Sequence, residues 1–162
     1  MEKKECCGCG NDVRLVLACS GGSNVGQITN EVAKRLDVDG QARMYCLAGA
    51  GGHISGMVAS IQGAKKVLVL DGCPVQCGKM VMDQAGIDDY EYLVVTELGV
   101  EKAHDFRLDT NDVDRVTAAS RVKLNGDRED KSNEQTANSY TSACASGERD
   151  RGGCCCGGDQ AC

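Results

Sequence analysis

Short apolar runs alternate with longer stretches of helical periodicity between residues 13 and 125. The runs cover residues 13–18, 42–46, 66–70 and 90–96 and are rich in Val, Leu or Tyr, as strands are. Strands that alternate with helices are typical of βαβ units. The pattern therefore predicts an α/β fold with a doubly wound, mostly parallel sheet of about four strands, either Rossmann-like or flavodoxin-like.

Four helices are predicted around these strands. The first follows the turn at residues 20–23, ends at Gly40, and repeats apolar residues at helical spacing: Val25, Ile28, Val32 and Leu36. A glycine-rich loop then leads into a short helix that carries the apolar residues Met57, Val58 and Ile61. The third helix is predicted to begin at Pro74 and to close at Gly86. The last is expected at residues 111–124, with Val113, Val116 and Val122 facing the sheet.

The two ends of the chain do not follow this pattern. Residues 1–11 are charged and hold Cys6, Cys7 and Cys9. Residues 126–162 are rich in Gly, Ser, Asn, Asp, Glu and Arg, and they offer too little apolar surface to offset the entropy of ordering. We therefore expect a flexible cysteine-containing N-terminus at 1–11, an α/β domain at 12–125, and a disordered cysteine-rich tail at 126–162.

Composition and charge narrow the classes of partner. Only 3% of the residues are aromatic, so the core must be aliphatic, and the formal net charge of −6 opposes binding to nucleic acid or to an anionic membrane surface. No apolar run approaches the roughly 20 residues of a membrane helix, and the N-terminus lacks the hydrophobic region of a signal peptide. We expect a cytoplasmic protein, and no protein partner is indicated.

The chain contains 12 cysteines, which in a reducing compartment indicate metal binding or thiol chemistry more than a disulfide framework. Cys19, Cys46 and Cys73 each follow a predicted strand, with equal spacings of 46 − 19 = 27 and 73 − 46 = 27 residues. The carboxyl ends of parallel strands share one edge of a sheet, where ligands bind. Cys77 lies four residues after Cys73, across the predicted helix start. The sequence thus predicts one metal site formed by four thiolates.

Three motifs carry a resemblance to a known family. They are the segment 19–26 that starts at Cys19, the segment 46–52 that starts at Cys46, and the Asp-Gly-Cys motif of Asp71, Gly72 and Cys73 with its extension to Cys77. They resemble the DGC-domain family, described as zinc-binding proteins, over roughly residues 12–105. The resemblance implies that Cys19, Cys46, Cys73 and Cys77 are the proposed metal ligands.

Several assignments stay open at this point. Zinc is the simplest ion for four thiolates, but an iron–sulfur cluster uses the same ligands, and Cys73 with Cys77 could instead form the reactive pair of a thiol-redox enzyme. Whether the domain is an enzyme is therefore undecided, although His53 is the better-placed histidine for acid–base chemistry. Asp71 either orients a metal ligand or is a turn residue. The glycines around residue 51 lack the third position of a dinucleotide-binding motif.

Overall fold

The structure, a computed structural model, describes residues 13–126 of the chain. The flexible N-terminus predicted at 1–11 and the disordered tail predicted beyond Gly126 lie outside these residues. Both therefore stay predictions. None of the helices in the described part is long and apolar enough to cross a bilayer.

A four-stranded sheet forms the centre of the described domain, and its strands run parallel to one another. They are β1 (Arg14–Ala18), β2 (Arg43–Tyr45), β3 (Lys66–Asp71) and β4 (Glu91–Val94). Their order across the sheet is β2-β1-β3-β4. This confirms the predicted doubly wound parallel sheet, and the placing of β3 beside β1 is the flavodoxin-like order rather than the Rossmann one.

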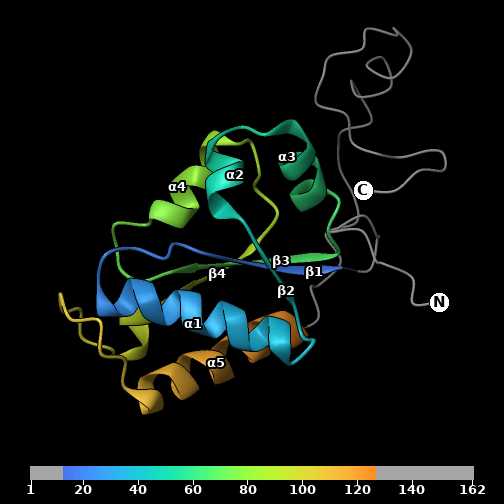
Figure 1. The fold of residues 1–162 in the computed structure, drawn as a ribbon. Coiled ribbons are helices and arrows are strands. Elements are labelled where there is room, and N and C mark those ends of the chain that lie inside the picture. Colours follow the sequence, from blue (N-terminus) through green and yellow to red (C-terminus); the bar gives the residue numbers. More distant parts are fainter. Residues whose placement is uncertain (1–12, 127–162) are drawn as a thin grey trace, which may run out of the picture. The chain divides into compact units, whose positions relative to one another are not determined.

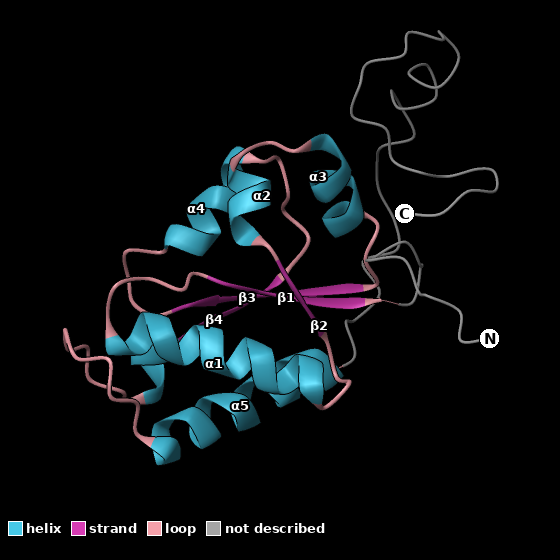
Figure 2. Ribbon diagram, in the orientation of Figure 1, coloured by secondary structure: helices cyan, strands magenta, loops and turns pink. Residues whose placement is uncertain are grey.

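Helices cover both faces of the sheet (Figures 1 and 2). One face carries α1 (Asn24–Val38) and α5 (Thr110–Asn125). The other carries α2 (Leu47–Gly51), α3 (Ser55–Gln62) and α4 (Cys77–Gln84), while a short 3₁₀ helix, η1 (Val95–Leu98), follows β4. Each helix layer shields one side of the strands from water, as all-parallel sheets require.

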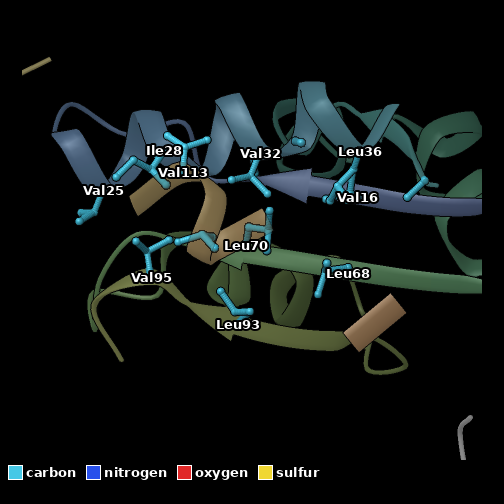
Figure 3. Close-up of a cluster of buried hydrophobic side chains, with 14 of the residues drawn as sticks. Val16, Val25, Ile28, Val32, Leu36, Leu68, Leu70, Leu93, Val95 and Val113 are labelled. Carbon is cyan, nitrogen blue, oxygen red and sulfur yellow. The ribbon is translucent and has the colours of Figure 1, made fainter. Parts of the chain in front are cut away.

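Two apolar cores lie between the sheet and these helix layers. On the side of α1 and α5, Val16 and Leu70 of the strands pack with Ile28 and Val32 of α1 (Figure 3). On the opposite side, Leu15, Leu17 and Val69 pack with Ile61 and Met82. Alternate residues of one strand thus enter different cores, which explains why β3 is buried along its whole length and reads as an unbroken apolar run.

The four predicted helices are present, but residues 47–51 of the predicted glycine-rich loop form a further short helix, α2. The helix α4 begins at Cys77, so the prediction of a start at Pro74 is wrong. Pro74 instead lies in a turn that is closed by a hydrogen bond of 3.1 Å from the Gln76 amide to the Cys73 carbonyl. Val122 of α5 is 72% exposed and does not face the sheet as predicted. The fourth strand ends at Val94 because the chain tightens there into η1.

The connections after β1 and β3 diverge to opposite faces of the sheet. The chain leaves β1 for α1 on one face, whereas it leaves β3 for α4 on the other face (Figure 1). Because β1 and β3 are neighbours, their carboxyl ends form the switch point at which open α/β sheets bind ligands. The cysteine-containing loops therefore start at the edge where a site is expected.

Candidate metal centre

A cavity of about 170 Å³ opens at the carboxyl ends of β1 and β3. Three cysteines line it: Cys19 after β1, Cys73 after β3, and Cys77 at the start of α4. Its remaining wall includes glycines of the segment 20–26 and the side chain of Lys102. Three of the four predicted ligands are thus brought to one cavity by segments that are far apart in the sequence.

Cys46 has a different position. It directly follows β2 and precedes α2, and it is exposed and does not line this cavity. Its side chain makes no capping hydrogen bond to the helix that follows it. The equal 27-residue spacing correctly placed Cys46 at the end of a strand, but this strand lies on the far side of β1 from β3. The four-cysteine set as a whole stays a prediction.

The Cys19 thiol lies between two polar groups. The Gly72 amide donates a hydrogen bond of 3.3 Å to Cys19 Sγ, and the Thr29 hydroxyl of α1 lies 3.6 Å from the same sulfur. Thr29 Oγ1 in turn donates to the Gly26 carbonyl at 2.7 Å. The Cys19 thiol is therefore held in place by two elements, the β3 end and α1.

The Cys73 thiol has a cation beside it. Lys102 Nζ donates to Cys73 Sγ at 3.3 Å from the loop that links η1 to α5. Sequence reasoning missed Lys102, because the two residues are 29 positions apart and no local pattern connects them. This contact joins the loop after η1 to the turn that follows β3.

Asn24 fixes the loop that carries Lys102. Its side-chain amide donates to the Glu101 carbonyl at 2.8 Å and its Oδ1 accepts from the Ala103 amide at 2.7 Å. The backbone amide of Asn24 also donates a hydrogen bond of 3.0 Å to the Ala103 carbonyl. Because these three bonds hold the residues on either side of Lys102, they determine where its ammonium group lies.

The two histidines differ in their relation to the site. Nδ1 of His104 lies 2.8 Å from the carbonyl oxygen of Gly22, a residue of the cavity wall, and its ring packs edge-on against Phe106. His53 is exposed after α2 with a positive φ of 52° and does not line the cavity. The structure therefore places His104, and not the predicted His53, next to the cavity wall.

Asp71 anchors the start of α4. It is 1% exposed, and its two carboxylate oxygens accept hydrogen bonds from the Gly78 amide at 2.8 Å and the Lys79 amide at 2.9 Å. Tyr92 of β4 donates a third bond of 2.9 Å from its hydroxyl. These bonds occupy the carboxylate and hold the first turn of α4, whose first residue is Cys77. Asp71 thus orients the segment of a predicted metal ligand.

The Tyr92 hydroxyl is suited to this donor role. Burial raises the pKa of Tyr92 above its usual value, and the hydrogen bond to Asp71 raises it further. The neighbouring Tyr90, whose ring meets Tyr92 edge-on, also has its pKa raised, to about 12, first by burial and then by its bond to Asp83. Both hydroxyls therefore remain protonated donors throughout the neutral range.

The backbone beside two of the cysteines adopts the left-handed region. Ser20 follows Cys19 with a φ of 49°, and Gln76 precedes Cys77 with a φ of 57°. Residues other than glycine rarely adopt this backbone conformation. It costs of order 1 kcal/mol or more and persists where the surrounding structure enforces it. Such strain clusters at functional sites, and here Gln76 lines the cavity while Ser20 lies between two residues that line it, Cys19 and Gly21.

The thiol set matches the donor chemistry of zinc, for which thiolate is a preferred ligand. The cation and the amide groups around the sulfurs would offset the negative charge of bound thiolates. Among residues 13–126, however, no group of three or more Cys, His, Asp or Glu side chains is arranged closely enough to hold an ion. The cavity therefore supplies suitable donors without presenting a finished coordination shell.

Comparison with known proteins places this arrangement in a family. The family model of the DGC domain matches residues 15–120, a range that contains all four internal cysteines. A curated relative, the anaerobic and virulence modulator AnvM of Pseudomonas aeruginosa, is 36% identical over 102 residues, which cover 63% of this chain and 78% of that protein. No solved structure shows a significant match. The chain belongs to the DGC-domain family.

Proposed function

We propose that this protein is a metal-binding regulatory module whose cysteine thiolates capture the ion at the switch point of the sheet. The observation that carries the proposal is the convergence of Cys19, Cys73 and Cys77 on one cavity. Free cysteines occur in many cores as small apolar side chains, but these three are half-buried or exposed and line one cavity at the ligand-binding edge of the sheet. The pattern is that of a ligand set.

The surroundings of the sulfurs support binding of a cation by thiolates. A set of thiolates accumulates negative charge, and this domain places the Gly72 amide at Cys19 and the Lys102 ammonium group at Cys73. Both groups lie beside the sulfurs on which the negative charge of metal-bound thiolates would accumulate. Zinc is the simplest candidate, because it favours thiolate ligands and needs no redox partner.

A regulatory role is suggested by the relative from Pseudomonas aeruginosa, whose name describes a modulator. A metal that bridges the β1 loop and the start of α4 would tie together two segments on opposite faces of the sheet. Loading or loss of the ion could then change the surface at this edge. This is how a sensor module would convert metal binding into a structural signal.

The alternative function is thiol-redox chemistry or an iron–sulfur cluster. The cation beside Cys73 suits this alternative as well, because reactive cysteines lie in electropositive, partly exposed surroundings. Cys77, four residues further on, would then act as the resolving thiol. An iron–sulfur cluster would use the same thiolates and would give the protein a brown colour.

Anaerobic purification followed by elemental analysis and a visible absorption spectrum tests the proposal. We expect stoichiometric zinc in the wild-type chain and at least a fivefold lower content in Cys73→Ser, because this change removes a cavity thiolate. Cys154→Ser is the matched control and should retain the wild-type content, because it removes a thiol that lies outside the folded domain predicted at 12–125.

An equal loss of zinc in Cys73→Ser and Cys154→Ser would contradict the proposal and would assign metal binding to the terminal cysteines. Iron together with sulfide in the wild-type protein would replace zinc by a cluster. A metal-free wild-type protein with rapidly reacting Cys73 would favour the thiol-redox function.

A further inference from the structure

We propose that Asn24 is a positioning residue for the cysteine cavity. It latches residues 101–107, here called the strap, so that Lys102 of the strap closes the cavity at Cys73. Release of the latch lifts the strap and opens the cavity to larger molecules. The inference goes beyond the proposed function, because it concerns access to the thiols and not the identity of what they bind.

The strap is anchored at both ends and exposed between them. Val100 on one side is 3% exposed in the core beneath α1 and α5, and Leu108 on the other side packs against the same core. Gly99, directly before Val100, has a φ of 81°, a conformation that favours glycine and allows the chain to turn there. Between the anchors, six of the seven strap residues are exposed and Asp105 is half-buried. Such a segment can move without disturbing the core.

Contacts within the strap hold its outer turn together. The backbone amide and guanidinium group of Arg107 donate hydrogen bonds to the Asp105 carboxylate, the shortest of them 2.7 Å long. The rings of His104 and Phe106 meet edge-on, with their centroids 5.7 Å apart. Because these contacts do not involve the rest of the domain, we expect the strap to move as one piece.

Asn24 holds the strap to the domain from a fixed position. It is the first residue of α1 and directly follows the capping residue Ser23. Its side chain bonds the Glu101 carbonyl and the Ala103 amide, which lie on either side of Lys102. Both bonds are exposed to solvent, so water can replace them when the strap lifts. One side chain of α1 therefore acts as the latch.

The latched strap places two of its residues on the cavity wall. Lys102 lines the cavity and donates to Cys73 Sγ at 3.3 Å, and Nδ1 of His104 lies 2.8 Å from the carbonyl oxygen of Gly22, which also lines it. Lifting the strap withdraws Lys102 from the wall and leaves Cys73 uncovered on that side. Cys46 is exposed and lies outside the cavity, so its surroundings stay the same.

Competitive labelling of the reduced, metal-free, full-length protein tests the inference. N-ethylmaleimide and the bulkier fluorescein maleimide react with a thiolate through the same group. The ratio of their labelling rates at one cysteine therefore measures access to the sulfur, since the thiolate fraction affects both rates alike. Mass spectrometry gives this bulky-to-small ratio for Cys73 and, in the same sample, for the exposed Cys46.

Asn24→Ala should raise the ratio at Cys73 about threefold or more and leave the ratio at Cys46 unchanged, because it releases the strap alone. Lys102→Ala should produce a similar rise, because it removes the side chain that closes the cavity. In the double variant the ratio should equal that of Lys102→Ala, since Asn24 acts through Lys102 and the two effects do not add.

Asn125→Ala is the matched control. It also removes an exposed asparagine contact, a hydrogen bond of 3.0 Å from Arg14, but at the opposite ends of the strands, where β1 begins. Both ratios should stay at their wild-type values. Circular dichroism of each variant confirms that the domain is folded.

Three results would overturn the inference. An unchanged ratio at Cys73 in Asn24→Ala would show that the latch does not control access. An equal rise at Cys46 would show that Asn24→Ala loosens this whole edge of the domain. A rise in the double variant equal to the product of the two single rises would show that Asn24 and Lys102 act independently. Because all measurements are made without metal, they leave the proposed function untouched, and absence of metal binding would leave the latch standing.

Discussion

Asp71 links the cysteine site to the body of the domain. Its buried carboxylate accepts from the Gly78 and Lys79 amides and from the Tyr92 hydroxyl, so one side chain joins the end of β3, the start of α4 and β4. A turn residue and a residue that orients a ligand were the two interpretations open from sequence. The hydrogen bonds show that Asp71 fixes the helical turn that begins with Cys77, while its role toward a metal stays a prediction.

Replacing Asp71 by Ala should destabilise the domain by about 1–3 kcal/mol, because it leaves the two amide donors of α4 and the Tyr92 hydroxyl without their acceptor. Urea unfolding of the metal-free protein measures the loss. Asp83→Ala is the matched control, since the exposed Asp83 side chain accepts a surface hydrogen bond of 3.2 Å from the Tyr90 hydroxyl. Similar losses in the two variants would mean that the Asp71 contacts do not stabilise α4.

The sequence identified the cysteines of the site but not the residues that surround them. Cysteine spacing and strand ends identified three residues that share the cavity. Lys102 and Asn24 could not be recognised, because their partners lie 29 and up to 79 residues away and depend on how the loop after η1 folds back. Such contacts are products of tertiary packing and leave no periodic signal in the chain.

Among the helices and strands, α1 packs closely against the end of β3. A Cβ atom on Gly72 would lie 2.8 Å from the Gly26 amide nitrogen and 2.9 Å from the Val25 carbonyl carbon. These are backbone atoms of α1 and cannot move independently of the helix. The glycine of the Asp-Gly-Cys motif is therefore required by packing against α1. From this position its backbone amide donates a hydrogen bond to Cys19 Sγ.

Gly72→Ala should cost about 1–3 kcal/mol of unfolding free energy, because the added methyl group forces α1 away from β3. Gly21→Ala provides the comparison, since a Cβ atom there would meet nothing within 4 Å and should change stability by less than about 0.5 kcal/mol. Thermal or urea unfolding of both variants is the measurement. Equal stability of Gly72→Ala and wild type would show that α1 can shift without cost.

Strands and long helices were predictable because their apolar periodicity follows directly from burial. Val25, Ile28, Val32 and Leu36 of α1 are all buried, as their spacing predicted. The start of α4 was misplaced because Pro74 is equally compatible with a first helical position and with a turn. The hydrogen bond from the Gln76 amide to the Cys73 carbonyl and the left-handed backbone of Gln76 identify the turn.

For the whole molecule, strand order determines which cysteines meet. The sequence predicted a parallel sheet but left the order open between a Rossmann-like and a flavodoxin-like arrangement. The observed order β2-β1-β3-β4 makes β1 and β3 neighbours whose helices lie on opposite faces. This opens the crevice that contains Cys19, Cys73 and Cys77, whereas Cys46 ends a strand further along the edge.

Anaerobic alkylation of the full-length protein, with the modified cysteines mapped by mass spectrometry, tests the central claim that these thiols jointly bind a metal. In the zinc-loaded protein we expect Cys19, Cys73 and Cys77 to be protected together, and a chelator should expose all three at once, because a coordinated thiolate reacts only after the metal leaves. Rapid labelling of Cys73 alone in the zinc-loaded protein would contradict a shared metal site and would favour thiol chemistry at this sulfur.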